Sequence, residues 1–422
     1  MDNQENDSLA DKLKKILKDA YSSRGRRISN RKRNILVAAG VHDPISASIA
    51  SRIALKIYGN PIENPWAVQI SGFGLAASRK MLPDTGEIGV EEIVNGSIEI
   101  LNSVKNVSED LFVMADIDHA YCAPDEEPTI VEQIIKAGIC AFNIEDQQYV
   151  INPDSMRDIV EKLKKDYPSA NLKYLKRSKP PIYFLKSCGH IGTEKIYIEG
   201  RIGGGKVILP KESMIKKIEN AAAIRDKLKD DYGDVVINAR TDIFGVYEYQ
   251  SGQAAIDDAL DRGNSYLEAG ADMIFYEAVK PFEGYSQREV IEILTKETKG
   301  PVNFNALKGG KTKDPITIDE MDKLGVAAIS LPINALEAQI SALTETYISI
   351  FKGIEKDKPD AIDFKSTIDF LGWAEKFESM KNWPHETVKQ GGAEKIDEFI
   401  SSISGAYEKF VEREIEKITD QR

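Results

Sequence analysis

The residues most able to do chemistry are acids that follow short apolar runs. Asp116 and Asp118 follow the run LFVMA, and Glu145 closes the run ICAFNIE. Carboxylate oxygens are the ligands that hard cations prefer, so three acids on neighbouring strands predict a site for Mg²⁺, with Mn²⁺ as the alternative. Acids at such positions also cap the helices that follow them. Capping accounts for one or two of these residues but not for a series across several strand ends.

Other polar residues end the later apolar runs. Arg240 follows VVINA, Glu277 follows DMIFY, and Asn305 ends VNFN. The planar guanidinium of Arg240 is suited to clamping a carboxylate or stabilising a developing oxyanion. A structural ion pair with its acidic neighbours is the alternative.

A thiol lies in the segment KSCGH. Cys188 stands between Lys186 and His190, and nearby positive charge lowers the pKa of a thiol, which favours proton exchange or nucleophilic attack. The alternative is a small buried cysteine with no chemical role. The chain has three cysteines and no C-x-x-C pair, which argues against a disulfide scaffold or a zinc ribbon.

Eight continuous apolar runs must position these residues, and helical patterns lie between them. The runs cover residues 35–40, 67–71, 111–116, 139–145, 235–240, 272–277, 302–305 and 326–331. Such runs are typical of parallel strands buried on both faces. Gly138, Gly270 and Gly325 each close a helical segment just before a strand. Eight repeats of this unit predict the α/β class and a (β/α)8 TIM-type barrel, with a doubly wound open sheet as the alternative.

The other segments are arranged around this barrel, which is expected to span residues 35–352 of the 422. Residues 1–34 are predicted to form a charged N-terminal arm, and residues 353–422 a C-terminal helical extension. Residues 148–206 separate the fourth strand from its helix, where ~2–6 residues are usual. Because such an insertion emerges at the catalytic end of a barrel, we expect a lid that carries a catalytic loop. A decorative subdomain is the alternative.

Charge and composition bear on partners and location. A net charge of −12 makes nucleic acid an unlikely main partner. The basic residues within 24–33 are interpreted as part of a solvated arm that packs on an acidic neighbouring subunit, with RNA binding as the alternative. No apolar run approaches the ~18 residues of a membrane span, and no apolar signal segment is present, so we expect a soluble cytoplasmic protein without membrane partners.

Seven motifs, taken in order, resemble the isocitrate lyase / phosphoenolpyruvate mutase superfamily. They are SGFG, LPDTG, D-x-D, IEDQ, KSCGH, ARTD and EAGADMIF. The resemblance covers roughly residues 35–352, and KSCGH makes the 2-methylisocitrate lyase-like branch the most similar. It implies a barrel whose last helix swaps onto a neighbouring subunit, giving a homotetramer that is a dimer of dimers.

The resemblance implies roles for individual residues. The metal Mg²⁺ would lie near Asp116, Asp118 and Glu145. The catalytic set would be Cys188, Arg240, His190 and Lys186. The predicted substrate-binding set is Ser71, Gly72, Phe73, Asp84, Gly189, Glu277 and Asn305. Cys188 would transfer the proton, and Asp84 lies on a mobile PDTG loop that would help to cover the site.

The implied reaction is retro-aldol cleavage of a 2-hydroxy di- or tricarboxylate such as isocitrate or 2-methylisocitrate. The products would be an α-keto acid or glyoxylate and a carboxylate such as succinate. Phosphonopyruvate hydrolysis, phosphoenolpyruvate mutation and oxaloacetate hydrolysis or decarboxylation are alternatives within the superfamily. Cys188 favours the lyase because the mutase branch lacks the CGH loop. A pseudo-enzyme is a further alternative.

Four departures from the family pattern concern the substrate rather than the fold. Ser187 replaces a basic residue of the catalytic loop, and the chain before that loop is tens of residues longer. Lys308 stands where 2-methylisocitrate lyases have a substrate-contacting Glu. The segment 119–121, His-Ala-Tyr, replaces the usual Gly-rich turn after the metal acids.

A dinucleotide-binding enzyme is the alternative from a different class. Gly72, Gly74 and Ala77 fit the pattern G-x-G-x-x-A after a strand. That fingerprint belongs to the first strand–helix turn of its fold, whereas this one follows the second strand and leads into LPDTG. The pattern therefore does not favour a dinucleotide site.

Overall fold

Eight parallel strands close into a barrel in the order β1-β12-β11-β10-β9-β4-β3-β2. The strands are β1 (Leu36–Val41), β2 (Trp66–Ile70), β3 (Val113–Asp116), β4 (Ala141–Glu145), β9 (Val236–Thr241), β10 (Met273–Tyr276), β11 (Val302–Asn305) and β12 (Ala328–Leu331). Every neighbouring pair is parallel. The predicted TIM-type barrel is confirmed, and each predicted run contains or overlaps one strand.

This computed structural model describes residues 7–29, 31–82, 88–122, 126–148, 183–191, 194–203, 206–247, 249–306, 316–353, 362–374, 378, 397 and 400–419. The chain divides into two compact units, residues 1–340 and residues 341–422. The barrel belongs to the first unit. Among the described residues, no helix is both long and apolar enough to cross a membrane.

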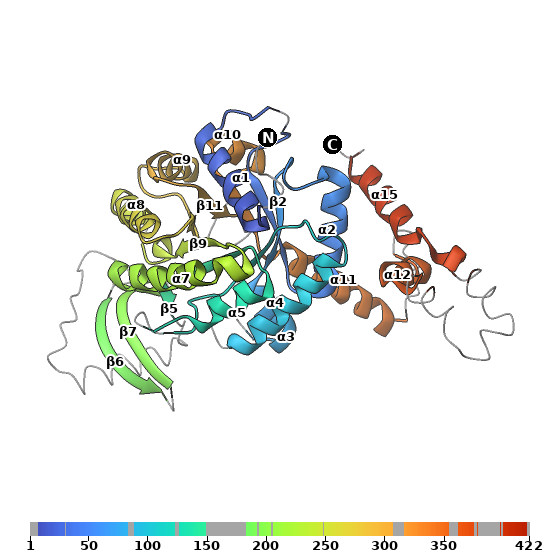
Figure 1. Cartoon of the computed structure of the whole chain (residues 1–422), viewed down its shortest axis with the longest axis horizontal. Helices are drawn as coiled ribbons and strands as arrows, with labels where there is room; N and C mark the ends of the chain where they lie inside the picture. Colours follow the sequence, from blue (N-terminus) through green and yellow to red (C-terminus); the bar gives the residue numbers. More distant parts are fainter. Residues whose placement is uncertain are drawn as a thin grey trace. The chain divides into compact units, whose positions relative to one another are not determined.

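Helices alternate with the strands and surround the barrel (Figure 1). They are α2 (Pro44–Tyr58), α3 (Gly72–Lys80), α4 (Val90–Lys105), α5 (Thr129–Ala137), α7 (Lys211–Tyr232), α8 (Gly252–Glu268), α9 (Gln287–Glu297) and α10 (Ile318–Leu324). A further helix, α11 (Asn334–Phe351), follows β12 in the chain. Gly138 and Gly325 end α5 and α10 with φ of 90° and 86°. As predicted from the sequence, these glycines adopt the left-handed conformation that closes a helix.

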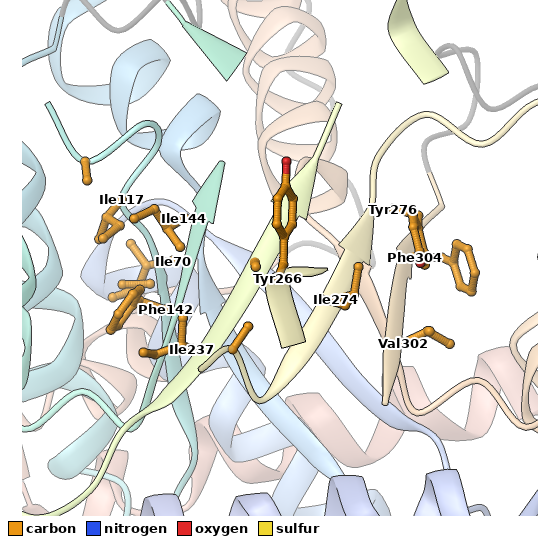
Figure 2. Close-up of a cluster of buried hydrophobic side chains, with 14 of the residues drawn as sticks. Ile70, Ile117, Phe142, Ile144, Ile237, Tyr266, Ile274, Tyr276, Val302 and Phe304 are labelled. Atoms are coloured by element: carbon orange, nitrogen blue, oxygen red, sulfur yellow. The ribbon is translucent and has the colours of Figure 1, made fainter. Parts of the chain in front are cut away.

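The outward face of the barrel packs against these helices through one apolar core. Figure 2 shows Phe142 and Ile144 of β4 near Ile237 of β9, with Tyr276 and Phe304 on the strands beyond them. All five side chains are buried. Because successive strand residues point to opposite faces, the alternate residues of these strands face the interior of the barrel.

The interior at the starts of the strands is apolar and is covered by α1 (Leu9–Ser23). Leu13, Ile16 and Leu17 of this helix form one buried cluster with strand residues such as Ala38 and Met273. The helix begins at Ser8, whose side chain caps it. Part of the predicted N-terminal arm therefore closes the end of the barrel opposite the carboxyl ends of the strands.

Charged residues of the same helix pair with the barrel of their own chain. The Nζ atom of Lys14 lies 2.8 Å from Oδ1 of Asp234 and 3.2 Å from Oδ1 of Asp272. Arg24 donates to the carbonyl of Lys296 at 3.2 Å. Lys14 and Arg24, two basic residues of the predicted N-terminal arm, therefore contact the barrel of their own subunit.

Amide side chains fill the middle of the barrel. Asn238 donates to Oδ1 of Asn143 at 2.7 Å, and Asn303 donates to the hydroxyl of Ser330 at 3.1 Å. These residues and Gln69 are almost completely buried. The barrel interior thus changes from apolar beside α1 to polar beneath the carboxyl ends of the strands.

The insertion after β4 contains an antiparallel sheet in the order β5-β8-β7-β6. Its strands are β5 (Gln147–Gln148), β6 (Tyr183–Ile191), β7 (Glu194–Gly203) and β8 (Lys206–Ile208). Figure 1 shows β6 and β7 as one long hairpin. The short strands β5 and β8 begin and end the insertion, so they connect it to β4 and α7.

In the second unit, α12 (Phe364–Phe370) packs with α15 (Ala406–Thr419). The rings of Phe370 and Tyr407 have centroids 4.7 Å apart. The backbone N–H of Tyr407 donates to Oδ2 of Asp369 at 2.9 Å, and the Ser366 hydroxyl donates to the carbonyl of Ala406 at 3.2 Å, so an aromatic contact and hydrogen bonds join the two helices. Both helices lie within the predicted C-terminal helical extension.

Candidate active site

The register of the strands brings three of the predicted site residues to one face. Asp116 pairs with Asn143, and two residues further along β4 Glu145 pairs with Arg240. Residues that pair, and residues two apart on one strand, point to the same side of a sheet. That side is the barrel interior, because the intervening Ile144 packs in the outer core. The side chains of Asp116, Glu145 and Arg240 therefore meet at the carboxyl end of the barrel.

Arg240 is the centre of this group. Its Nε and Nη2 atoms donate to the two carboxylate oxygens of Asp242 at 2.8 and 3.0 Å. Its Nη1 atom lies 3.2 Å from Oε2 of Glu145 and 3.7 Å from Oδ2 of Asp116. The guanidinium carbon is 5.4 Å from the centre of the Phe275 ring. The fork is thus fixed on one side by an ion pair and directed on the other toward the predicted metal acids.

Burial and the neighbouring charges both shift the pKa values of Glu145 and Arg240. Removal from water raises the pKa of Glu145 well above its usual range, and Arg240 opposes that rise. The acids Asp242, Asp118 and Asp116 raise the same pKa further. For Arg240, burial alone would lower the pKa, but the surrounding carboxylates raise it. The guanidinium is a permanent positive charge within an excess of carboxylates.

The three predicted metal ligands fit a hard cation in donor type and in charge. Asp116, Asp118 and Glu145 offer only carboxylate oxygens, and all three are buried. Within the part of the chain that the structure describes, no three Asp, Glu, His or Cys side chains are already arranged around one point. The side chains of the three acids would therefore have to rotate before they could converge on one ion. Arg240 Nη1 contacts both Glu145 and Asp116, so such a rotation would also change these two ion pairs.

The start of α3 forms another wall of this end of the barrel. Ser71 caps the helix by accepting from the N–H of Gly74 at 3.0 Å. A Cβ on Gly72 would lie 2.7 Å from Oδ1 of Asp118, so any other residue here would require the Asp118 carboxylate to shift. Phe73, the next residue, is 41% exposed. Gly72 therefore borders two of the predicted metal acids, Asp118 and Asp116, and the substrate-binding roles of Ser71 and Gly72 stay predictions.

Two other predicted residues lie at neighbouring strand ends. Asn305 ends β11 and is 4% exposed. Within the described chain its Oδ1 atom has no hydrogen-bond partner, so it could accept a hydrogen bond from a substrate. Glu277 follows β10, is buried, and is one of the acids that raise the pKa of Arg240. Asp84 and Lys308 lie outside the described residues.

The predicted catalytic loop forms part of a long hairpin rather than a short connection. Lys186, Cys188, Gly189 and His190 lie on β6, where Cys188 pairs with Tyr197 of β7. In the order β5-β8-β7-β6, strand β6 is the one furthest from β5, which continues from β4. The structure gives the backbone register of this loop, and the roles of its side chains remain predictions.

Sequence reasoning missed a second buried network just behind the site. Asp146 accepts hydrogen bonds from Thr241 at 2.7 Å, from the N–H of Asp242 at 2.9 Å, from Tyr266 at 2.9 Å and from Arg262 at 3.1 Å. This network ties β4 to β9 and α8. Asp146 therefore has a structural role that explains why it follows Glu145 without joining the predicted metal set. The sequence does contain a signal for this role. Asp146 directly follows Glu145, and consecutive strand residues point to opposite faces, so the two acids cannot both face the barrel interior.

The family described as phosphoenolpyruvate phosphomutase matches residues 27–173 and 183–351. A 2-methylisocitrate lyase of Aeropyrum pernix is 26% identical over 81% of this chain and 84% of its own length. A 2,3-dimethylmalate lyase of Eubacterium barkeri is 25% identical over 81% and 90%.

Among solved structures, an oxaloacetate acetylhydrolase in complex with 3,3-difluorooxalacetate matches with a TM-score of 0.61. It is 19% identical, and the match covers 89% of this chain and 96% of that one. At this identity the likeness supports the fold alone. The family match spans more than half of the chain, and the curated relatives include lyases and a phosphorylmutase. The chain therefore belongs to the PEP mutase/isocitrate lyase superfamily of enzymes.

Proposed function

We propose that this enzyme is a Mg²⁺-dependent carbon–carbon lyase that cleaves a 2-hydroxy di- or tricarboxylate. The observation that carries the proposal is the position of Arg240 between Asp242 on one side and Glu145 and Asp116 on the other. Such a site combines a fixed guanidinium, which recognises carboxylates, with acids suited to a divalent cation. The 2-methylisocitrate and 2,3-dimethylmalate lyases among the relatives agree with this substrate class.

Substrate would be held at both sides of the barrel mouth. Asn305 would accept a hydrogen bond from the substrate through its Oδ1 atom, which is the acceptor described above. Ser71 and the N–H groups at the start of α3 would face a substrate carboxylate, because a helix N-terminus favours negative charge. Arg240 would hold the carbonyl oxygen that forms as the bond breaks.

Asp116, Asp118 and Glu145 would hold Mg²⁺, which as a Lewis acid would orient the chelated substrate oxygens and offset their negative charge. In the retro-aldol step the 2-hydroxyl gives its proton to a water molecule, the adjacent carbon–carbon bond breaks, and an α-keto acid or glyoxylate forms. The electron pair of the broken bond passes to the other fragment, which is stabilised as an aci-carboxylate. The Cys188 thiol would protonate that carbon and release a carboxylate such as succinate.

For this step β6 must bring Cys188 to the barrel mouth. The loop is therefore proposed to act as a closing lid that also excludes water. Lys186 and His190 would lower the pKa of the thiol in the closed site. Gly189 and Asp84 would contact substrate from the lid and from the PDTG loop.

We also propose a homotetramer, a dimer of dimers that exchanges its last barrel helix, located in the cytoplasm. Supporting this assembly, α11 carries many exposed apolar side chains. These are Ile340, Leu343, Tyr347, Ile348, Ile350 and Phe351. Apolar side chains gathered on one helix are typical of a surface that another subunit covers.

A substrate panel tests the proposed reaction. The full-length protein is incubated with Mg²⁺ and isocitrate, 2-methylisocitrate, 2,3-dimethylmalate, oxaloacetate or phosphonopyruvate, and the products are identified by mass. Release of a keto acid and a carboxylate from a 2-hydroxy acid supports the lyase. Products from oxaloacetate or phosphonopyruvate alone would assign the enzyme to another reaction of the superfamily. Cleavage of none would contradict the proposed substrate class.

A further inference from the structure

The turn that carries Asp118 has an unusual backbone. Directly after β3, Asp118, Ala120 and Tyr121 have φ of 49°, 62° and 53°. Glycine adopts this left-handed conformation readily, whereas residues with a Cβ rarely do. None of these three positions is a glycine, so the surrounding contacts must hold the turn in this shape.

Contacts from the neighbouring strand and within the turn provide part of this support. The N–H of Glu145 donates to the carbonyl of Asp118 at 3.0 Å, and the N–H of Ala120 donates to the carbonyl of Ile117 at 3.0 Å. The Tyr121 hydroxyl donates to Oδ2 of Asp118. The same backbone conformation that places Tyr121 thus also orients one of the predicted metal carboxylates.

The remaining support comes from α7. Lys217, in the second turn of this helix, is only 2% exposed, and its Nζ atom donates to the carbonyl of His119 in the middle of the turn 118–121. Its neighbours on the same face of α7, Met214, Ile218 and Ala221, are buried apolar residues. Burying an ammonium among apolar side chains is costly unless the charge has partners. A methionine or leucine would fill this position without that cost.

The charge of Lys217 is also directed toward the acids of the site. Burial lowers the pKa of Lys217, whereas Cys122, Glu145 and Asp146 raise it. The ammonium is thus close enough to Glu145, one of the predicted metal acids, to interact with it electrostatically. Both its hydrogen bond and its surroundings connect Lys217 to the segment that presents Asp118.

We propose that Lys217 is a positioning residue for the metal site. By holding the carbonyl of His119, it keeps Asp118, Ala120 and Tyr121 in the left-handed conformation in which the Tyr121 hydroxyl fixes the Asp118 carboxylate. Glycines would adopt this conformation without support, whereas here the hydrogen bond from Lys217 stabilises it. The inference rests on the proposed function, because Asp118 must hold a metal for the role to matter.

Binding of Mn²⁺ alone, measured by electron paramagnetic resonance on the full-length protein, tests this role without a substrate. Lys217→Met removes the hydrogen bond and keeps the apolar length of the side chain. Lys216→Met is the matched control, because Lys216 is the adjacent residue on α7 and is exposed. We expect Lys217→Met to weaken Mn²⁺ binding by about tenfold or more, as for other supporting residues of metal sites, and Lys216→Met to leave it unchanged.

A second substitution separates positioning from general stability. In the Lys217→Met background, Ala120→Gly lets the turn adopt its positive φ without support, so most of the Mn²⁺ affinity is expected to return. A loss of affinity that Ala120→Gly does not restore would contradict the positioning role. Should Lys217→Met not fold, Tyr121→Phe tests the same turn, and unchanged Mn²⁺ affinity in that variant would overturn the proposal.

The outcomes distinguish this inference from the proposed function. If the wild-type protein does not bind Mn²⁺, both the metal site and the role of Lys217 are wrong. If the wild type binds Mn²⁺ and Lys217→Met binds it equally well, only the role of Lys217 is wrong. Weaker binding in Lys217→Met, restored by Ala120→Gly, supports both.

Discussion

Arg240 and Asp242 form a two-pronged ion pair, with Nε–Oδ2 and Nη2–Oδ1 distances of 2.8 and 3.0 Å. The remaining nitrogen of the guanidinium, Nη1, is left to face Glu145 at 3.2 Å. A planar group held at two points cannot rotate freely about its bonds. The pair therefore sets the direction in which Arg240 presents its free edge to the barrel mouth.

This geometry predicts that Arg240→Lys is a severe change although the charge is kept. An ammonium cannot contact both oxygens of Asp242 and also face Glu145, so we expect kcat to fall roughly 100- to 1,000-fold, as when an oxyanion donor is lost. Steady-state kinetics measures the effect. Arg288→Lys, which alters an exposed ion pair with Glu320, is the control and should retain activity.

The buried network behind the site predicts a large effect on stability. Arg262→Met removes the guanidinium that lies 3.1 Å from Oδ2 of Asp146 and leaves a buried carboxylate without its ion pair. We expect the free energy of unfolding to fall by about 3–5 kcal/mol. Lys299→Met breaks an exposed pair with Glu268 and should cost no more than ~1 kcal/mol. Urea unfolding compares the two, and equal losses would contradict the prediction.

Two cysteines should differ in reactivity. Burial raises the pKa of Cys140 from 9.0 to about 12, so this thiol stays protonated and protected in the folded protein. Cys188, flanked by Lys186 and His190, should react first with iodoacetate near pH 7. Peptide mapping by mass spectrometry identifies the labelled residue. Labelling of Cys140 at the same rate would show that its burial or the predicted activation of Cys188 is wrong.

The raised pKa of Cys140 also has a consequence for stability at high pH. Below pH 9.0 the thiol is protonated in both the folded and the unfolded state. Above that pH the unfolded chain loses the proton while the folded protein retains it. The free energy of unfolding is therefore expected to fall as pH rises from 9.0 to about 12, and Cys140→Ala should reduce this dependence.

If another subunit covers the exposed apolar side chains of α11, then charged substitutions on that surface should prevent the subunits from associating. Leu343→Glu combined with Tyr347→Glu places two carboxylates on that surface, which should prevent its burial against another subunit. Light scattering after size exclusion should then report a smaller species than the tetramer proposed for the wild type. Lys299→Glu, at another exposed position, is the control. A wild type and a double variant of equal mass would contradict the proposed role of α11.

Strand positions and the polar residues at their ends could be predicted because burial on both faces leaves a continuous apolar run in the sequence. Side chains alternate between the two faces of a strand, so the register of β3, β4 and β9 decides that Asp116, Glu145 and Arg240 share one face. Packing of α1 beneath the barrel was missed, although the spacing of Leu13, Ile16, Leu17 and Ala20 gives it an apolar face. The sequence prediction described residues 1–34 only as a charged arm and assigned this apolar face no partner.

Other features depend on contacts that no local pattern encodes. Lys217 lies in a charged helix, and its burial follows only from the approach of the turn after β3. The hairpin that carries Cys188 depends on pairing between β6 and β7, which a family resemblance to a short loop does not predict. The clamp between Arg240 and Asp242 could have been predicted from their spacing, but its effect on Glu145 depends on the barrel register.

The proposed carbon–carbon lyase is tested most directly by cleavage in D₂O. The full-length enzyme, with Mg²⁺, is given the 2-hydroxy acid that the panel identifies, and both products are analysed by mass. The account predicts equal amounts of keto acid and carboxylate, with one deuterium on the α-carbon of the carboxylate product, which is the carbon that was joined to the keto fragment. It also predicts no cleavage after chelation of Mg²⁺. Cleavage that continues without Mg²⁺, or a carboxylate product that lacks deuterium, would contradict it.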